Sequence, residues 1–228
     1  MSRGLGDVYK RQGEGESCDC RLLAYDVVTR RVTAEVFGHR LHYTLQADGV
    51  HMALNSVATL AVIASLGYPP EAALPRLTRF QALPGRGEVN SLTVAAHPLT
   101  VIDDAYNANP GSMLAAVAQL SESTHTGRKV LVLGEMAELG DAFEHYYLSL
   151  IDSINRSRID HIYLIGPTYR NYAHAFSTDK QFRLLDDVDA FRVGYLKQIQ
   201  DNDVVLFKGS NATRVWTLVN WLKRLASR

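Results

Sequence analysis

Apolar and polar residues alternate with two different periods along this chain, and the change of period divides it into two parts. Short runs of alternating apolar and polar residues fill positions 21–46 and are typical of an antiparallel meander of strands. A helical pattern over residues 51–66 follows and ends at Gly67, and a second short helix is predicted over residues 70–79. We therefore expect the first part to consist of antiparallel strands and helices.

From residue 88 onward, strand patterns alternate with helical patterns. The continuous apolar runs Val130–Leu133 and Val204–Phe207 suit strands that are covered on both faces. Strands and helices that alternate at this spacing predict an α/β fold with a doubly wound, mostly parallel sheet and right-handed crossovers. The predicted strands span residues 92–95, 99–102, 129–133, 161–165, 182–185 and 204–207, and the predicted helices span residues 110–121, 142–155, 169–176, 188–198 and 212–225.

The segment Leu83–Gly87 holds a proline and two glycines and separates the two patterns. Such a composition is typical of a linker, and we place the domain boundary there. The expected domains are residues 13–84 and residues 85–228. Residues 1–12 fit neither pattern and are expected to be a non-native leader.

The composition excludes several classes of protein. The chain has 24 basic and 24 acidic residues, so no net charge attracts nucleic acid or an anionic membrane surface. No apolar stretch approaches the roughly 18 residues that a membrane-spanning helix needs. Cys18 and Cys20 are too close together for a zinc knuckle without a second pair, and we expect two thiols in a reducing cytoplasm.

The segment from Val101 to Ser112 carries the most chemistry for its length. The apolar run ends at Ile102, and two carboxylates, a tyrosine and two asparagines follow before a helical pattern starts at Pro110. Asn109 is a favourable N-cap, and proline suits the first helical position because its missing N–H is not needed there. Asp and Asn are also common turn residues, which explains one or two of these five side chains but not all. A strand that ends in polar residues and leads directly into a helix predicts a ligand site.

Four predicted strands end in distinctive residues that a parallel sheet would gather at one edge. These are Asp103–Asp104, Gly134–Glu135, Gly166–Pro167 and Lys208–Ser210. Exposed helix N-termini and a lysine would suit this edge to an anion. Lys208 directly follows an apolar strand, so we predict a functional role for it rather than a solvated surface position. Arg86 has glycine on both sides, which lets its guanidinium approach a phosphate closely, although a surface charge in a linker is the alternative.

Five short motifs resemble those of the Mur ligases and occur along the chain in the same order as in that family. The segment Asp103–Pro110 looks like the Asp-Asp-Ser-Tyr-Asn-Ala-Asn-Pro element of that family. The other four stretches are Gly49–Asn55, Leu83–Arg86, Leu133–Gly140 and Phe207–Ser210. Each motif is weak alone, but five in sequence over about residues 20–228 make the resemblance specific.

Within the family, the resemblance is to the ligases that join D-alanyl-D-alanine to UDP-N-acetylmuramoyl-tripeptide in peptidoglycan precursor synthesis. It implies a Rossmann-like C-terminal domain, preceded by the end of an ATP-binding central domain. The implied reaction uses ATP and Mg²⁺ to phosphorylate the terminal carboxylate of the tripeptide, and the amine of the dipeptide then attacks the acyl phosphate. A cytoplasmic monomer is expected.

The resemblance also implies roles for eight residues, none of them a metal ligand. The expected ATP-binding residues are Asn55 at the adenine, Asp104 at the ribose, Arg86 at the phosphates, and Asn107. The expected substrate-binding residues are Tyr106, Asn109 and Ser210, and the expected catalytic residue is Lys208.

Three positions depart from the family's pattern, and one element is missing. Met52, Glu135 and Asn211 stand where the family has asparagine, aspartate and, in many relatives, arginine, which leaves the contacts to the amine substrate open. No Gly-x-x-x-x-Gly-Lys-Ser/Thr sequence occurs, so nothing in the chain is expected to cradle the β- and γ-phosphates of ATP. We therefore expect a C-terminal fragment of a ligase that is inactive alone.

Two other functions stay open on the sequence. The missing phosphate loop favours a doubly wound domain that binds a nucleotide or a small ligand without chemistry. A folylpolyglutamate synthase has a similar architecture, but the string Tyr106–Pro110 favours the muramoyl enzyme. A dehydrogenase-like fold is disfavoured because no Gly-x-Gly-x-x-Gly follows a strand.

Overall fold

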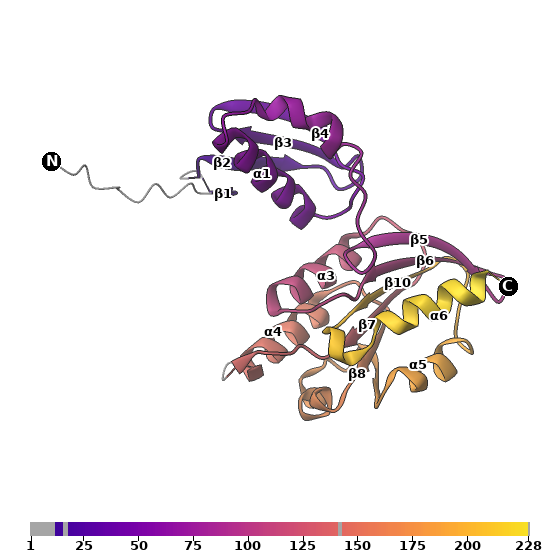
Figure 1. Cartoon of the computed structure of the whole chain (residues 1–228). Helices are drawn as coiled ribbons and strands as arrows, with labels where there is room; N and C mark the ends of the chain where they lie inside the picture. The colour runs from indigo at the N-terminus through magenta and orange to yellow at the C-terminus, as the bar shows by residue number, and fades with distance from the viewer. Residues whose placement is uncertain (1–11, 16–17, 141–142, 228) are drawn as a thin grey trace. The chain divides into compact units, whose positions relative to one another are not determined.

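The computed structural model describes residues 12–15, 18–140 and 143–227. By its internal contacts the chain divides into two compact units, Met1–Gln81 and Ala82–Arg228 (Figure 1). This division falls three residues before the boundary placed from the sequence at 84/85. The leader predicted over residues 1–12 lies outside the described residues except for Gln12.

The N-terminal unit is a small sheet with helices. Its strands β1 (Gln12–Gly13), β2 (Cys20–Tyr25), β3 (Arg31–Val36) and β4 (His39–Thr44) lie in the order of the chain. Strands β2, β3 and β4 pair antiparallel, as the alternating pattern predicts. Helix α1 (Val50–Ser65) buries Ala53, Val57 and Leu60 against this sheet.

The helix predicted over residues 70–79 is shorter and of two kinds. A 3-10 turn η1 (Pro70–Ala73) leads into a single α-helical turn α2 (Leu74–Leu77). Pro75 lies inside this segment, and because proline has no N–H to donate, it cannot continue a ladder of helical hydrogen bonds begun before it.

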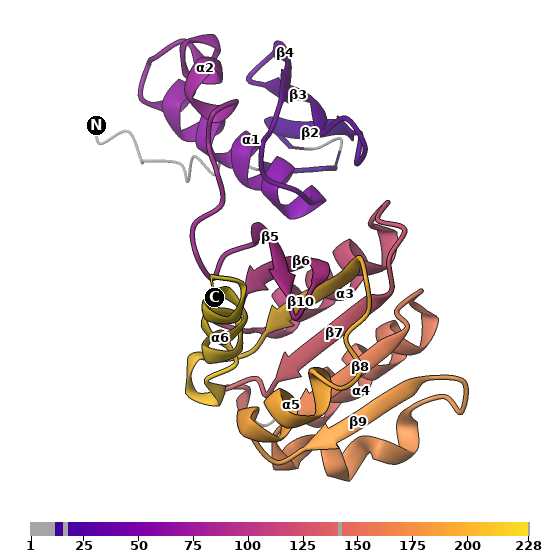
Figure 2. The ribbon, with the colours of Figure 1, turned by 90° about the vertical axis from the view of Figure 1, so that its right-hand side faces the viewer.

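The C-terminal unit is built on a six-stranded sheet in the order β5-β6-β10-β7-β8-β9 (Figure 2). The strands are β5 (Glu88–Val94), β6 (His97–Asp104), β7 (Lys129–Gly134), β8 (His161–Ile165), β9 (Gln181–Leu185) and β10 (Asp203–Lys208). All neighbours pair parallel except β5, which pairs antiparallel with β6. The predicted doubly wound, mostly parallel sheet is confirmed.

Helices cover both faces of this sheet. One apolar core packs Leu131, Leu133 and Leu206 against α3 (Pro110–Glu122), α4 (Phe143–Arg156) and η3 (Pro167–Ala175). The other packs Val130, Val132 and Val205 against α5 (Val188–Tyr195) and α6 (Trp216–Ala226). Alternate residues of β7 and β10 therefore face two different cores, which explains why both strands are continuously apolar.

Four local predictions need correction. The short strands predicted at 92–95 and 99–102 are the middle of one long hairpin, whose turn residues Ala95 and Ala96 take φ values of 49° and 72°. The predicted helix 169–176 is the 3-10 helix η3, and α5 ends at Tyr195 instead of residue 198. The predicted helix 212–225 is interrupted by Arg214 at φ 58°, so a 3-10 turn η4 (Asn211–Thr213) precedes α6.

Candidate functional site

The carboxyl ends of β6 and β10 bring two candidate residues into contact. Asp104 and Lys208 are register partners on these adjacent strands, although 104 positions separate them in the chain. The ammonium Nζ of Lys208 lies 2.6 Å from Oδ2 of Asp104. The expectation that the two side chains share one edge of the sheet is confirmed, and we call this edge, formed by the ends of β6, β10, β7 and β8, the carboxyl edge.

The two members of this pair differ in exposure. The side chain of Lys208 is 3% exposed, whereas that of Asp104 is 24% exposed. The same ammonium also donates to the main-chain oxygens of Asn107 at 3.2 Å and of Asp104 at 3.5 Å. The carboxylate therefore reaches the surface of the edge, and the lysine lies beneath it.

The loop between β6 and α3 ends in the predicted cap. The side chain of Asn109 accepts a hydrogen bond from the N–H of Ser112, and the hydroxyl of Ser112 accepts one from the N–H of Asn109. Asn107 uses its side-chain oxygen to accept from the N–H of Ala108. Both amide oxygens are thus engaged within the loop, and the amide NH₂ groups are the parts of these side chains that suit an acceptor on a ligand.

The turn that carries Arg86 is fastened to the end of β6. The N–H of Arg86 donates to the carbonyl of Leu83 at 2.9 Å, with Pro84 second in the turn and Gly85 third at φ +76°, the arrangement of a type II turn. Buried Asp103 accepts from the N–H of Gly85 at 3.0 Å. Arg86 therefore lies on a turn that is hydrogen-bonded to the end of the sheet.

A side chain at Gly85 would crowd Tyr106. A Cβ built on it would lie 3.0 Å from Cβ of Tyr106, whose N–H donates to the carbonyl of Gly85. The N–H of Gly87 also donates to the carbonyl of Asp103. Burial raises the pKa of the Asp103 carboxyl, against the opposing effect of the hydrogen bonds from Gly85 and Ala105.

Arg86 and Tyr106 form the exposed part of this assembly. The guanidinium carbon of Arg86 lies 4.2 Å from the centre of the Tyr106 ring, a cation–π contact, and Tyr106 is 51% exposed. The ring supports the guanidinium from one side and leaves its edge accessible. Arg86, Asp104, Tyr106 and Asn107 are therefore connected through the ends of β6 and β10.

The loop after β7 is held by two tyrosines that the sequence did not single out. The hydroxyl of Tyr169 donates to the carbonyl of Gly134 at 2.9 Å, and the N–H of Met136 donates to the hydroxyl of Tyr147 at 3.2 Å. Burial raises the pKa of Tyr147 to about 12. Helical periodicity places Tyr147 on the buried face of α4, but it does not reveal which backbone group the hydroxyl meets.

Between these tyrosine contacts, Glu135 is engaged by neighbouring loops. Its carboxylate accepts from the N–H of Thr168 at 2.6 Å, at the start of η3, and its carbonyl accepts from the N–H of Ser210 at 3.0 Å. A Cβ on Gly166 would lie 2.4 Å from the side chain of Glu135. The longer carboxylate at this position therefore lies over Gly166 and caps the 3-10 helix.

Ser210 and Asn55 differ from the residues above in their surroundings. Ser210 is 4% exposed, because Gly134, Gly209 and Thr213 approach one another closely beside it. Asn55 is exposed on α1 of the N-terminal unit, and the structure describes it within that unit alone.

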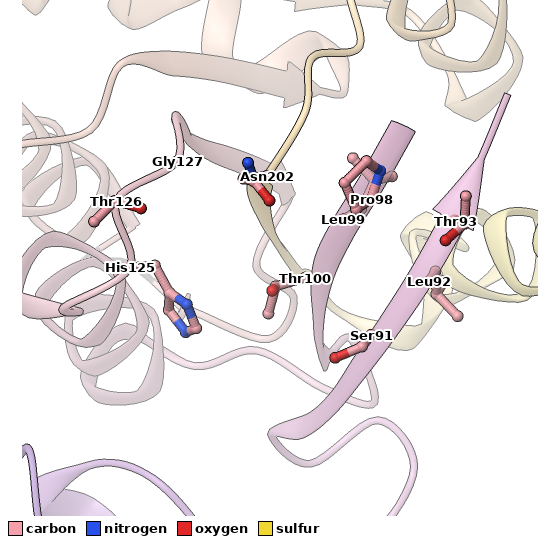
Figure 3. Close-up of a pocket in the computed structure, with 10 residues that line it drawn as sticks. All are labelled: Ser91, Leu92, Thr93, Pro98, Leu99, Thr100, His125, Thr126, Gly127 and Asn202. Carbon is pink, nitrogen blue, oxygen red and sulfur yellow. The ribbon is translucent and has the colours of Figure 1, made fainter. Parts of the chain in front are cut away.

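A hollow of about 350 Å³ lies at the opposite edge, toward the amino ends of β6, β7 and β10 (Figure 3). None of the predicted site residues lines it. Its lining residues are Ser91, Leu92, Thr93, Pro98, Leu99, Thr100, His125, Thr126, Gly127 and Asn202.

Two further kinds of feature are absent from the described residues. Over residues 12–15, 18–140 and 143–227, no three His, Cys, Asp or Glu side chains come together as a metal site. Within the same described part of the chain, no helix has the length and apolar character required to cross a membrane.

The chain is similar in sequence to known proteins of one family. The family model described as "Mur ligase, glutamate ligase domain" matches residues 85–211. The UDP-N-acetylmuramoyl-tripeptide–D-alanyl-D-alanine ligase of Treponema pallidum is 30% identical over 226 residues, which cover 90% of this chain and 46% of that protein. The chain thus spans about half the length of the curated relatives it matches.

Solved structures show the same fold. A structure of MurF from Acinetobacter baumannii aligns with a TM-score of 0.78 and 26% identity, covering 92% of this chain and 46% of that one. The MurF ligase from Thermotoga maritima, solved in complex with ADP, aligns with a TM-score of 0.75 and 24% identity over 93% of this chain and 48% of that one. At that identity the second likeness concerns the fold alone.

Proposed function

The chain belongs to the Mur ligase family, and from this premise we propose that its carboxyl edge receives the ribose and phosphates of ATP in a peptidoglycan precursor ligase. The observation that carries the proposal is the connected assembly at that edge. It combines an accessible carboxylate, Asp104, with a guanidinium, Arg86, that is fixed to the same strand end. A carboxylate accepts hydrogen bonds from ribose hydroxyls, and a guanidinium pairs with phosphate oxygens.

The complete reaction is that of an amide ligase. The terminal carboxylate of UDP-N-acetylmuramoyl-tripeptide attacks the γ-phosphorus of ATP, which gives an acyl phosphate and ADP. The amine of D-alanyl-D-alanine then attacks the acyl carbon, an amide forms, phosphate leaves, and the amine loses a proton. The names of the relatives support this choice of substrates. We place the reaction in the cytoplasm.

The proposed roles follow the geometry of the edge. Asp104 binds the ribose, and Arg86, held against the Tyr106 ring, binds the phosphates. The amide NH₂ groups of Asn107 and Asn109 are donors to ligand oxygens, since their amide oxygens are engaged in the loop. Ser210 contributes through its position between the β7 and β10 loops, whereas the adenine role of Asn55 rests on the resemblance alone.

Mg²⁺ belongs to the complete enzyme in this proposal. The described residues bring no three candidate ligands together, so no step is assigned to the metal here. The phosphate loop is likewise absent from the sequence, and we propose that the chain alone has no ligase activity.

Titration of the chain with ADP tests the nucleotide site. Asp104→Asn and Arg86→Ala are each expected to weaken ADP binding about tenfold or more, because each removes a charged hydrogen-bonding partner. Asp201→Asn is the matched control, since this exposed carboxylate lies near the opposite edge and pairs with His97. Equal affinity for ADP in Asp104→Asn, Arg86→Ala and the control would refute the assignment.

Two further measurements test the reaction class. The rate of ADP release from ATP in the presence of UDP-N-acetylmuramoyl-tripeptide and D-alanyl-D-alanine is expected to be the same with and without the chain. Clear turnover would disprove the proposal that the chain alone has no ligase activity. Calorimetry in the presence of ATP is expected to detect D-alanyl-D-alanine binding. Binding of L-glutamate instead would support the folylpolyglutamate synthase alternative.

A further inference from the structure

The ammonium of Lys208 is enclosed by a single loop. An ammonium has three N–H donors, and three acceptors surround this one: Oδ2 of Asp104, the carbonyl of Asp104 and the carbonyl of Asn107. All three belong to the last residue of β6 and the short segment that follows it. The lysine itself comes from β10, so it ties this loop to the central strand of the sheet.

The two side chains of the pair are buried to different extents. Lys208 is almost completely covered, while a quarter of the Asp104 side chain is exposed. A ligand that approaches the edge therefore meets the carboxylate first. Moving the ammonium outward would break its hydrogen bonds to the carbonyls of Asp104 and Asn107.

We propose that Lys208 is a positioning residue, which fixes the Asp104 carboxylate and the Asp104–Asn107 loop, and not a residue that touches the reacting atoms. The proposal rests on the nucleotide role of Asp104 given above. It replaces the catalytic role expected for Lys208 from the sequence. The loop it fixes also carries Tyr106, so the support of the Arg86 guanidinium depends on the same lysine.

Hydrogen–deuterium exchange of the chain tests the positioning without any ligand. Lys208→Met is expected to accelerate exchange of the Asp104–Asn109 amides about tenfold or more, and Lys208→Arg is expected to restore part of the protection. Lys129→Met is the matched control, because this buried lysine donates to the carbonyls of Ser121 and Ser123 at the other edge of the same sheet. The control is expected to loosen residues 121–126 and leave the Asp104–Asn109 loop unchanged.

A double-mutant cycle with ADP tests whether Lys208 acts through Asp104. Lys208→Met is expected to weaken ADP binding about tenfold in the native background and to have no further effect in the Asp104→Asn background. The double variant removes both charges of the pair, so it leaves no buried ion without its partner. Equal weakening of ADP binding in both backgrounds would show that Lys208 contacts the nucleotide itself.

The two measurements separate two kinds of failure. Unchanged exchange in Lys208→Met, or acceleration spread evenly over all six strands, overturns the positioning role whatever the nucleotide does. A native chain that takes up no ADP overturns the proposed nucleotide site, and the exchange experiment then decides the positioning of the loop alone.

Discussion

The two edges of the six-stranded sheet each hold a cation and a carboxylate from neighbouring elements, yet the two pairs are built differently. At the amino edge, Arg128 binds Asp203 through two nitrogens at 2.9 and 2.8 Å, and Asp203 is 0% exposed. Tyr195 and the N–H of Gln200 donate to the same carboxylate. At the carboxyl edge, Asp104 receives one side-chain donor and stays partly exposed.

This difference is the one we expect between a pair that only stabilises the fold and a pair that serves the proposed nucleotide site. Four hydrogen bonds and complete burial leave the Asp203 carboxylate nothing to offer a ligand, and it joins β10, the β7 start and the end of α5. Asp104 keeps accessible acceptor capacity on a support that is itself buried. A buried ion pair therefore indicates function only when one member remains reachable.

The strongest test of the contrast removes one carboxylate from each edge. Asp203→Ala is expected to lower the free energy of unfolding of the C-terminal unit by about 3–5 kcal/mol, because it leaves Arg128 partly buried without its partner. Asp104→Asn keeps an amide oxygen and two carbonyls as acceptors for the buried Lys208 ammonium, so it is expected to cost less stability than Asp203→Ala and to lose ADP affinity instead. Urea unfolding followed by tryptophan fluorescence reports on this unit, since both tryptophans lie in α6. Comparable losses of stability in the two variants would show that the two ion pairs do not differ in this way.

A second test concerns the backbone that supports Arg86 at the carboxyl edge. Gly85→Ala is expected to cost about 1–3 kcal/mol, because alanine is strained at φ +76° and its Cβ would meet Tyr106. Gly87→Ala, at φ +85° with nothing within 4 Å, is the control for backbone strain alone. The same urea titration should show a larger loss for Gly85→Ala, and ADP affinity should fall only there. Equal losses would mean that the Tyr106 contact contributes nothing.

The sequence was sufficient to predict the carboxyl edge but not the way in which its parts are fixed. Strand ends in a parallel sheet converge, so the meeting of Asp104 and Lys208 could be inferred from two apolar runs followed by polar residues. The burial of Lys208 beneath Asp104 depends on β10 lying between β6 and β7. No local sequence pattern indicates this order of the strands. Hydrophobic periodicity gives the face on which a residue lies, not the partner it meets at 3 Å.

The hairpin of β5 and β6 could not be predicted from its turn residues. Asn-Gly or Asp-Gly is the usual signal for a two-residue turn, and here the turn residues are Ala95 and Ala96. Nothing in two alanines indicates a left-handed backbone. The pairing of β5 with β6 over seven residues determines the turn, and the local preference is overridden.

The hairpin turn at the amino edge therefore offers a stabilising change. Ala95→Asn with Ala96→Gly is expected to raise the free energy of unfolding by about 0.5–1 kcal/mol, because both residues suit positive φ better than alanine does. Ala96→Val, with a branched side chain at φ 72°, is expected to lower it. Thermal unfolding measures both changes. A loss of stability in the Asn-Gly variant would contradict the assigned turn geometry.

The smallest expected effect is a pH dependence that comes from the amino edge. Burial, with a further contribution from the Arg128 charge, lowers the pKa of His161 below its ordinary value of 6.5. The unfolded chain then holds the proton more tightly, so His161 costs the folded state stability as the pH falls from about 6.5 through the lowered pKa. His161→Gln is expected to flatten the stability profile in that range.

Comparison at two pH values provides the control for this effect. At pH 8 the histidine is neutral in both states, so the native chain and His161→Gln should differ by the same amount at any higher pH. At pH 5.5 the gap should shift in favour of the variant. A gap that is constant from pH 8 to 5.5 would exclude His161 as the source.

The position of β10, the last strand that the described residues form, between β6 and β7 has a consequence for biosynthesis. Until Asp203–Lys208 has emerged from the ribosome, β6 and β7 each lack a neighbour, and two open strand edges face the nascent chain's surroundings. The Asp104–Lys208 contact cannot form any earlier. The support of the Asp104 carboxylate therefore arises only when β10 closes the sheet, and nucleotide binding at the proposed site would report that translation has passed Lys208.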